Sequence, residues 1–164
     1  MENNLNLIPS FLVNKLAVTE IIKCNEITCR YGLILSKKEA QELVKTRETA
    51  LCSNGRIEFS GGVINKLIIE FCDSPYISQD TYTETLNELI ETFYYFKNET
   101  LDEISDDELI SLMKKYFDKN CEGSIELLEN RELETLAHNI RYGINEEDSD
   151  EDIPEYFNWE DYDE

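Results

Sequence analysis

The strongest candidate for metal chemistry in this chain is a run of oxygen-bearing side chains at positions 118–129, which read Asp-Lys-Asn-Cys-Glu-Gly-Ser-Ile-Glu-Leu-Leu-Glu. The calcium loop of an EF-hand has oxygen ligands at positions 1, 3, 5, 7, 9 and 12 and a glycine at position 6. Gly123 stands at that sixth position. The ligand positions hold Asp118, Asn120, Glu122, Ser124, Glu126 and Glu129. The pattern therefore predicts a calcium site in which Ser124 contributes its carbonyl oxygen and Glu129 both carboxylate oxygens.

The same twelve residues also fit an ordinary connection between two helices. Glu122 is longer than the Asp or Asn that usually holds the fifth ligand position, and the chain has no second loop to pair with this one. In this interpretation Gly123 ends one helix and Ser124 begins the next. Calcium is the only cofactor that the sequence suggests, and a protein without a cofactor is the alternative.

Cysteine and histidine chemistry has no support in the spacing of these residues. The five cysteines are odd in number and scattered, and each lies in or beside an apolar stretch, as buried free thiols do. His138 is the only histidine, and no flanking motif pairs it with a nucleophile. We therefore assign no catalytic residue and no zinc site. Unpaired cysteines and an N-terminus without a positively charged signal lead us to expect a cytoplasmic protein.

Four aromatic residues stand in a strongly acidic segment at the C-terminus. Residues 145–164 contain eleven Asp and Glu and no Lys or Arg, so we expect a disordered tail over residues 144–164. A tail that only keeps the protein soluble does not need its aromatic side chains, which are Tyr156, Phe157, Trp159 and Tyr162. They predict a docking motif, in which aromatic anchors fill a partner's pockets while the acids attract its basic surface.

Two other interpretations of the tail stay open. In the first, the tail folds back onto the protein's own body. The acids of the tail would then bind to basic residues of a predicted helix, which are Lys37, Lys38, Lys45 and Arg47. In the second, the tail binds nothing.

A formal net charge of −21 limits the classes of partner. Phosphate backbones and anionic membrane surfaces attract clustered Lys and Arg, so we expect direct binding neither to nucleic acid nor to a membrane. The apolar runs are also too short to span a membrane. A protein partner with a basic surface is favoured instead. An acidic mimic of nucleic acid, which would occupy another protein's basic groove, is an alternative function.

Apolar residues recur at helical spacing through most of the first 143 residues. We expect helices near residues 10–32, 36–54, 63–72, 78–97, 105–118 and 125–143. Ser36 with Glu39, and Ser105 with Glu108, have the spacing of a capping box. Residues 33–35 and 57–59 predict at most one very short two-stranded β element. The predicted fold is therefore all-α, with a single domain of six or seven helices over residues 1–143, followed by the tail.

Several strings of residues resemble a family of small uncharacterised proteins, a domain of unknown function, from clostridia and related bacteria. The strings are Leu7-Ile8-Pro9-Ser10, Cys24-Asn25-Glu26, Phe71-Cys72-Asp73-Ser74-Pro75-Tyr76-Ile77-Ser78, Phe93-Tyr94-Tyr95-Phe96-Lys97-Asn98-Glu99 and Ser105-Asp106-Asp107-Glu108-Leu109. The resemblance covers residues 5–143 and implies no activity, so no functional residue is carried over from it. The residues themselves favour a non-catalytic interaction or regulatory protein, which binds a partner through a helical surface and the acidic aromatic tail. The alternatives are a calcium-binding protein and the acidic mimic.

Overall fold

The computed structural model describes residues 10–56 and 62–143, and this part of the chain contains helices but no strand. The all-α prediction is confirmed for it. The α-helices are α1 (Ser10–Lys23), α2 (Asn25–Thr28), α3 (Lys37–Asn54), α4 (Gly62–Phe71), α5 (Tyr82–Glu99), α6 (Asp106–Lys119), α7 (Ile125–Leu127) and α8 (Glu134–Arg141). Two 3₁₀ turns, η2 (Cys29–Tyr31) and η3 (Gln79–Thr81), and a π-helix, η4 (Leu128–Leu133), complete the described elements. None of these helices is long and apolar enough to cross a membrane.

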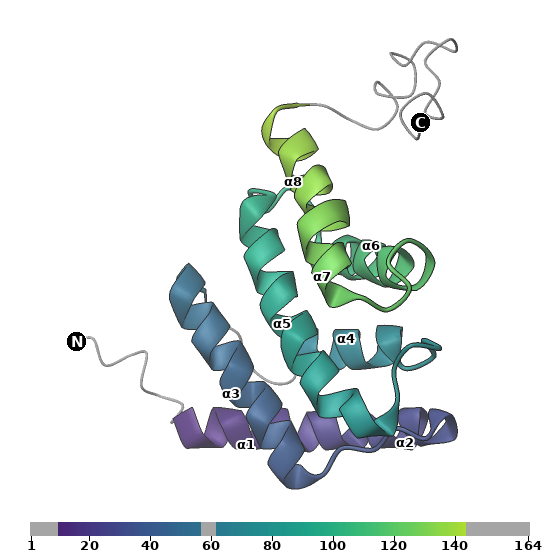
Figure 1. The fold of residues 1–164 in the computed structure, drawn as a ribbon. Helices are drawn as coiled ribbons and strands as arrows, with labels where there is room; N and C mark the ends of the chain where they lie inside the picture. Colours follow the sequence, from purple (N-terminus) through teal and green to yellow (C-terminus); the bar gives the residue numbers. More distant parts are fainter. Residues whose placement is uncertain (1–9, 57–61, 144–164) are drawn as a thin grey trace, which may run out of the picture.

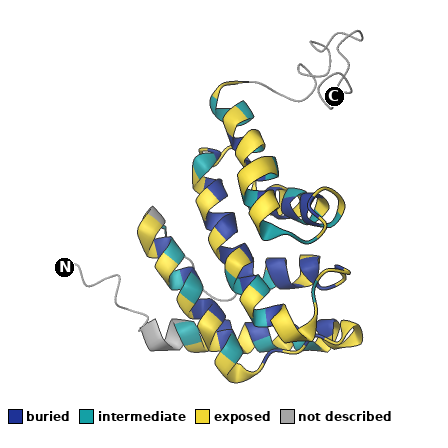
Figure 2. Cartoon of the chain, viewed as in Figure 1, coloured by how far each residue is buried: buried dark blue, intermediate teal, exposed yellow. Residues whose placement is uncertain are grey.

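Helix α5 is the central element of the fold. Helix α3 lies alongside it, α4, α6 and α8 pack against its other faces, and α1 crosses the end of the α3–α5 pair (Figure 1). On α5 the apolar residues at helical spacing from Tyr82 to Phe96 form a buried seam, and further buried residues lie outside it; the buried set includes Tyr82, Leu86, Leu89, Ile90, Phe93, Tyr94 and Phe96. Because more than one face of α5 is apolar, helices can cover it on several sides. Figure 2 shows the resulting buried positions along α4 and α5.

The segment before α3 is extended, but it pairs with side chains and not with a strand. Asn25 Nδ2 donates to the carbonyl of Leu35, and the N–H of Leu35 donates to Asn25 Oδ1, both at 2.9 Å. Gln79 forms the same two bonds with Ile34, at 2.8 and 2.9 Å. A side-chain amide carries one acceptor and a donor, like a peptide group, so these amides take the place of a neighbouring strand. The short β element is thus absent at residues 33–35, and its other half, residues 57–59, lies outside the described residues.

Local signals place the start of α3 correctly. Ser36 Oγ accepts from the N–H of Glu39 at 3.1 Å, and Glu39 Oε1 accepts from the N–H of Ser36 at 2.8 Å, which completes the predicted capping box. At α6, Ser105 Oγ accepts from the N–H of Glu108 at 3.2 Å, which is the first half of that pattern. These bonds join residues three apart, so they depend little on the rest of the fold.

Two predicted helices differ in their extent. The helix expected over residues 10–32 ends at Lys23, and the chain continues through α2 and η2 to Gly32, whose φ of 80° stops it as expected. The helix expected from residue 78 begins as α-helix only at Tyr82, after the turn that places Gln79 against Ile34. In both cases a residue close to the boundary, Asn25 or Gln79, bonds to the extended segment.

The last helical stretch contains a π-helix that its sequence did not predict. Leu128 and Leu133 are five residues apart and both fully buried, and Ala137 follows on α8. An α-helix turns residues five apart onto different faces, whereas a π turn, with bonds from residue i to i+5, brings them closer to one face. The π-helix therefore lets both leucines reach the core.

Candidate functional site

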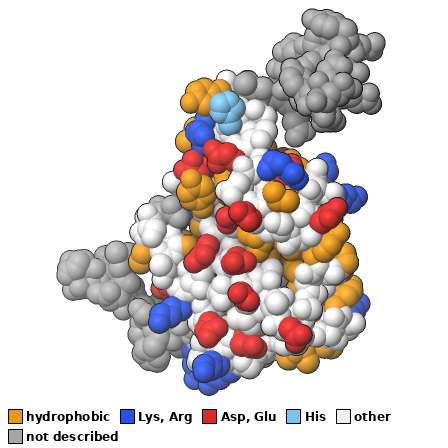
Figure 3. All heavy atoms as spheres, in the orientation of Figure 1, with side chains coloured by type: hydrophobic (Ala, Val, Ile, Leu, Met, Phe, Trp, Pro, Cys, Tyr) orange, Lys and Arg blue, Asp and Glu red, His pale blue; other side chains and the backbone are white. Residues whose placement is uncertain are grey.

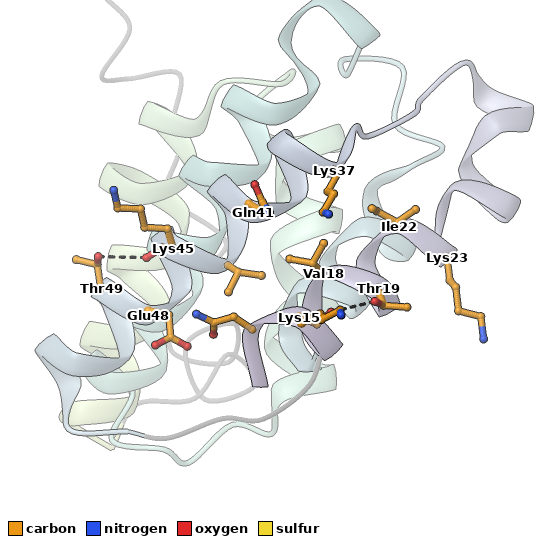
Figure 4. A pocket seen from close by; sticks show the side chains of 12 residues that line it. Lys15, Val18, Thr19, Ile22, Lys23, Lys37, Gln41, Lys45, Glu48 and Thr49 are labelled. Carbon is orange, nitrogen blue, oxygen red and sulfur yellow. Dashed lines mark hydrogen bonds between the residues drawn. The ribbon is translucent and has the colours of Figure 1, made fainter. Parts of the chain in front are cut away.

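A groove of about 1000 Å³ lies between α1 and α3, and we call it the α1–α3 groove. Its floor is apolar, with Val18 and Ile22 from α1 (Figure 4). Val44 of α3 also lines it. Val18 is 7% exposed and Val44 is 2% exposed, so both belong to the core as well as to the groove. Binding sites for small ligands usually measure about 300–1,000 Å³. The groove is therefore large enough for several side chains of another molecule or segment.

Four exposed lysines surround this apolar floor, and we call them the lysine rim: Lys15, Lys23, Lys37 and Lys45. Figure 4 shows Lys15 and Lys37 on opposite sides of Val18, with Lys23 and Lys45 towards the two ends of the groove. Lysine lays its hydrocarbon stem on apolar surface while its ammonium group stays in water. The rim thus extends the apolar surface and adds positive charge along its whole length.

The lysine rim is not neutralised by the described part of the chain. None of its four ammonium groups forms an ion pair with a described residue, although Arg56, Lys66, Lys97, Lys114, Arg131 and Arg141 all do. Among the described residues that line the groove, Glu48 is the single acid. An incoming carboxylate would therefore find cations that are not already engaged in ion pairs.

The groove also lies in the basic part of an acidic chain. Residues 10–56 carry eight basic and five acidic side chains, whereas residues 62–143 carry seven basic and eighteen acidic ones. On the face shown in Figure 3, acidic side chains gather in the middle and basic ones lie towards the margins. The α1–α3 region is consequently the part of the described protein that attracts anions.

Besides the lysines and Glu48, the polar groups that line the groove include two threonine hydroxyls. Thr19 Oγ1 donates to the carbonyl of Lys15 at 2.9 Å, and Thr49 Oγ1 donates to that of Lys45 at 3.2 Å, so both hydroxyls are satisfied within their own helices. The described lining contains no His or Cys that could act as a base or nucleophile. An apolar floor with a cationic rim selects a ligand that carries both apolar groups and carboxylates.

Helical periodicity explains which residues reach the groove. On α1 the lining residues recur every three or four positions from Lys15 through Val18 to Ile22, and on α3 they recur from Lys37 through Val44. The basic residues predicted as a binding place for the tail include Lys37 and Lys45 but not Lys15 or Lys23. The missed signal was this matching period on two segments, yet only the packing of α1 on α3 brings the two stripes face to face.

One member of the predicted seat for the tail is excluded. Arg47 is 0% exposed within α3, so its side chain cannot meet a segment that docks on the surface. Lys38 is exposed, but it does not line the groove. The two remaining residues of the prediction, Lys37 and Lys45, both belong to the lysine rim.

The twelve-residue calcium loop is not formed. Asp118 lies in the last turn of α6, where its carboxylate accepts from Ser74 Oγ at 2.7 Å and pairs with Lys114 Nζ at 2.9 Å. Glu129 lies in η4 and accepts from Thr92 Oγ1. Only residues 120–124 connect the two helices, and within them Ser124 caps α7 by accepting from the N–H of Leu127 at 3.2 Å. The helix-to-helix interpretation matches this geometry.

The remaining residues of the calcium pattern do not gather around one point. Asn120 accepts through its backbone carbonyl from Arg131 Nη2 at 2.6 Å, and Glu122 has a left-handed φ of 52°. Glu126 and Glu129 line a separate cleft of about 400 Å³. Within residues 10–56 and 62–143, no three His, Cys, Asp or Glu are grouped so that they could hold a metal ion. Calcium binding stays a prediction without geometric support.

The local structure explains why position 123 is a glycine. Its φ of +84° lies in the left-handed region, and a Cβ on it would stand 2.5 Å from Tyr76 Cβ. The ring of Tyr76 in turn meets Phe117 edge-on, with ring centroids 6.3 Å apart. Glycine at this position therefore permits a tight turn under an aromatic ring, and a calcium ion is not needed to explain it.

The cleft with Glu126 and Glu129 also contains Glu88 and Glu91 from α5. Burial raises the pKa of Glu88, and the nearby carboxylates of Glu84, Glu129 and Glu91 raise it further. The cleft is therefore a place where like charges repel one another.

The buried cysteines are poor nucleophiles. Burial raises the pKa of Cys24, Cys72 and Cys121, which keeps these groups as thiols. His138 is exposed on α8 and lies against the ring of Tyr142, with ring centroids 4.6 Å apart. These positions supply no nucleophile–base pair.

The predicted docking residues of the tail lie outside the described residues. Tyr156, Phe157, Trp159 and Tyr162 all belong to residues 144–164. Their role, like the disorder expected for the tail, stays a prediction.

Comparison with known proteins identifies relatives at the level of a family only. Residues 20–146 match DUF6323, described as a family of unknown function. This confirms the resemblance to a domain of unknown function, while the clostridial source inferred with it stays a prediction. No curated protein and no solved structure matches the chain.

Proposed function

Because the chain belongs to the DUF6323 family, whose function is unknown, we propose a function from the geometry: it is a non-catalytic interaction module that binds acidic, aromatic-containing segments of a protein partner in its α1–α3 groove. One observation carries the proposal. An apolar groove has a rim of four lysines without ion-pair partners among the described residues, in a chain whose net charge is −21. Lysines concentrated in this way suit an acidic ligand.

The apolar floor and the rim contribute differently to such binding. Burying apolar surface against Val18, Ile22 and Val44 stabilises the complex by roughly 25 cal/mol per Å². Each exposed pair of a lysine with a carboxylate adds only about 0.2–1 kcal/mol. The aromatic or aliphatic anchors of the ligand therefore supply most of the affinity, and the lysines select acidic partners and speed their association.

A fatty acid is the main rival ligand, since it also joins an apolar body to a carboxylate. A fatty acid has one charged end, however, and the lysines are distributed over the sides and both ends of the groove (Figure 4). A peptide segment with several acids distributed along it matches this arrangement better.

A labelled peptide with the sequence of residues 153–164 is a suitable probe, because it combines five acids with four aromatic residues. The protein would be the full chain with serine at all four aromatic positions of the tail, so that the tail does not compete: Tyr156→Ser, Phe157→Ser, Trp159→Ser and Tyr162→Ser. Fluorescence anisotropy should show saturable binding. In Lys37→Glu/Lys45→Glu, made in the same background, Kd should rise about tenfold, which corresponds to about 1.4 kcal/mol.

The matched control is Lys115→Glu/Lys119→Glu. These lysines are exposed on α6, away from the groove, and their reversal changes the net charge by the same amount. If this control weakens binding as much as the groove variant does, the peptide responds to overall charge and the proposal is wrong. If the peptide does not bind but a labelled dodecanoate does, the groove is a site for fatty acids.

The cytoplasmic location stays a prediction. Docking of the tail on a separate basic protein and mimicry of nucleic acid stay predictions. The proposal favours a basic surface on this chain itself as the seat for acidic segments.

A further inference from the structure

The chain contains a segment with the composition that the α1–α3 groove selects. Residues 144–164 contain eleven acids and no Lys or Arg, and four aromatic residues stand within seven positions near the end. The groove offers an apolar floor and a lysine rim. Segment and groove are therefore complementary both in charge and in apolar character.

The rest of the described protein does not attract this segment. Residues 62–143 carry eighteen acidic and seven basic side chains, so most of the surface outside α1, α2 and α3 repels an acidic tail. Several of those seven basic residues are already in ion pairs, among them Lys66, Lys97 and Lys114. Electrostatics therefore directs the tail towards the groove.

The tail is also long enough to reach the groove. The sixteen residues that follow Gly143, up to Trp159, can extend over at most about 55 Å. A domain of the described size has a diameter of roughly 36 Å, so the anchor residues can cross its surface from the end of α8 to α1 and α3 (Figure 1). A segment tethered in this way reaches an effective concentration of the order of 1 mM at its site.

We propose that the acidic aromatic tail of this chain is the resting occupant of its own α1–α3 groove, and that partner segments bind by displacing it. This inference rests on the proposed function of the groove. The tail then competes with partner segments for the groove. A partner segment binds only when its concentration or affinity is high enough to displace the tail. High salt weakens the lysine–carboxylate contacts and therefore favours release of the tail.

Trp159 reports the position of the tail without a label, since it is the only tryptophan of the chain. In the native full-length protein, its emission should lie at shorter wavelength than in the free 153–164 peptide. Its quenching constant with acrylamide, an uncharged quencher, should be at least about twofold lower, because a millimolar effective concentration keeps a weakly binding segment docked most of the time.

The groove variant and its control show where the tail binds. In full-length Lys37→Glu/Lys45→Glu, Trp159 should become as accessible as in the peptide, whereas in Lys115→Glu/Lys119→Glu it should stay protected. The native chain should also bind the labelled peptide about tenfold more weakly than the chain with four serines, because its own tail competes. Circular dichroism of each variant verifies that the helices are intact.

Each contrary result has a separate meaning. If Trp159 is exposed in the native chain while the peptide still binds the four-serine chain, the inference is wrong and the proposed function stands. If Trp159 is exposed and the peptide does not bind, both are wrong. Protection that persists in Lys37→Glu/Lys45→Glu places the tail elsewhere and overturns the inference. Protection that grows with protein concentration assigns the tail to the groove of a second copy, which also overturns it.

Discussion

Replacing Asn25 by alanine should destabilise the protein considerably more than replacing Gln79 by alanine, although the two side chains make the same pair of hydrogen bonds. Asn25 bonds to both peptide groups of Leu35 at 2.9 Å, and Gln79 bonds to those of Ile34 at 2.8 and 2.9 Å. The two sites differ in burial. Leu35 is 2% exposed, whereas Ile34 is 51% exposed and Gln79 is also on the surface.

Burial decides the size of the two effects. A hydrogen bond contributes about 0.5–1.5 kcal/mol, and a buried group left without a partner costs about 1–3 kcal/mol. Asn25→Ala leaves the N–H and carbonyl of the buried Leu35 without their partners, so we expect a loss of about 2–3 kcal/mol. At Ile34 water can replace the Gln79 amide, and Gln79→Ala should cost about 0.5 kcal/mol. For a protein of this length, the difference corresponds to roughly 4–10 °C in Tm.

Urea denaturation followed by far-ultraviolet circular dichroism measures both losses. Asn25→Asp is an informative third variant, because it keeps an acceptor for the N–H of Leu35 but has no donor for the carbonyl, and its loss should be intermediate. Should Gln79→Ala cost as much as Asn25→Ala, burial of Leu35 would not be what gives the amide contact its strength, and the reasoning would be refuted.

Three further perturbations test other parts of the structure. Gly123→Ala should lower stability by about 2–3 kcal/mol, because the new Cβ would stand 2.5 Å from Tyr76 Cβ at a left-handed φ; an unchanged thermal midpoint would contradict this. The N–H of Ser36 lowers the pKa of Glu39, so Glu39→Ala should cost about 0.5–1 kcal/mol at neutral pH. Because the folded pKa lies below the unfolded one, that loss should shrink as the pH falls through the folded pKa; urea titrations that show a constant loss down to strong acid would exclude an ionised carboxylate. Asp118→Ala should cost about 1–3 kcal/mol equally with calcium and with EDTA, since its partners are protein groups; a loss seen only with calcium would revive the calcium loop.

The predicted helices agree with the structure where a short-range pattern was sufficient. The seam from Tyr82 to Phe96 is buried because apolar residues at helical spacing form a stripe whatever covers them. The start of α3 follows from Ser36 and Glu39, which bond to each other's backbone across three residues. These patterns depend on residues three or four positions apart, so the neighbouring residues are enough to predict them.

The predictions that differ all involve contacts between distant residues. Residues 33–35 alternate like a strand, yet Asn25 and Gln79, which come from either side in the chain, supply their hydrogen-bond partners. Calcium binding at 118–129 stays a prediction, but Asp118, the first residue of that pattern, bonds to Ser74, which is 44 positions away. A sequence motif gives the spacing of residues along the chain. It does not predict which distant group forms a hydrogen bond with a given side chain.

Composition and the spacing of apolar residues by themselves determined that this protein is acidic, that its body is helical and that its C-terminal segment joins acids to aromatic residues. Tertiary structure alone decided that Lys15 and Lys23 of α1 face Lys37 and Lys45 of α3 across an apolar groove, while Arg47 of the same helix is buried. The reason is geometric. Helical spacing assigns each residue to a face of its own helix, but the angle and contact at which two helices pack depend on the whole core, and that packing determines which faces meet and which remain open.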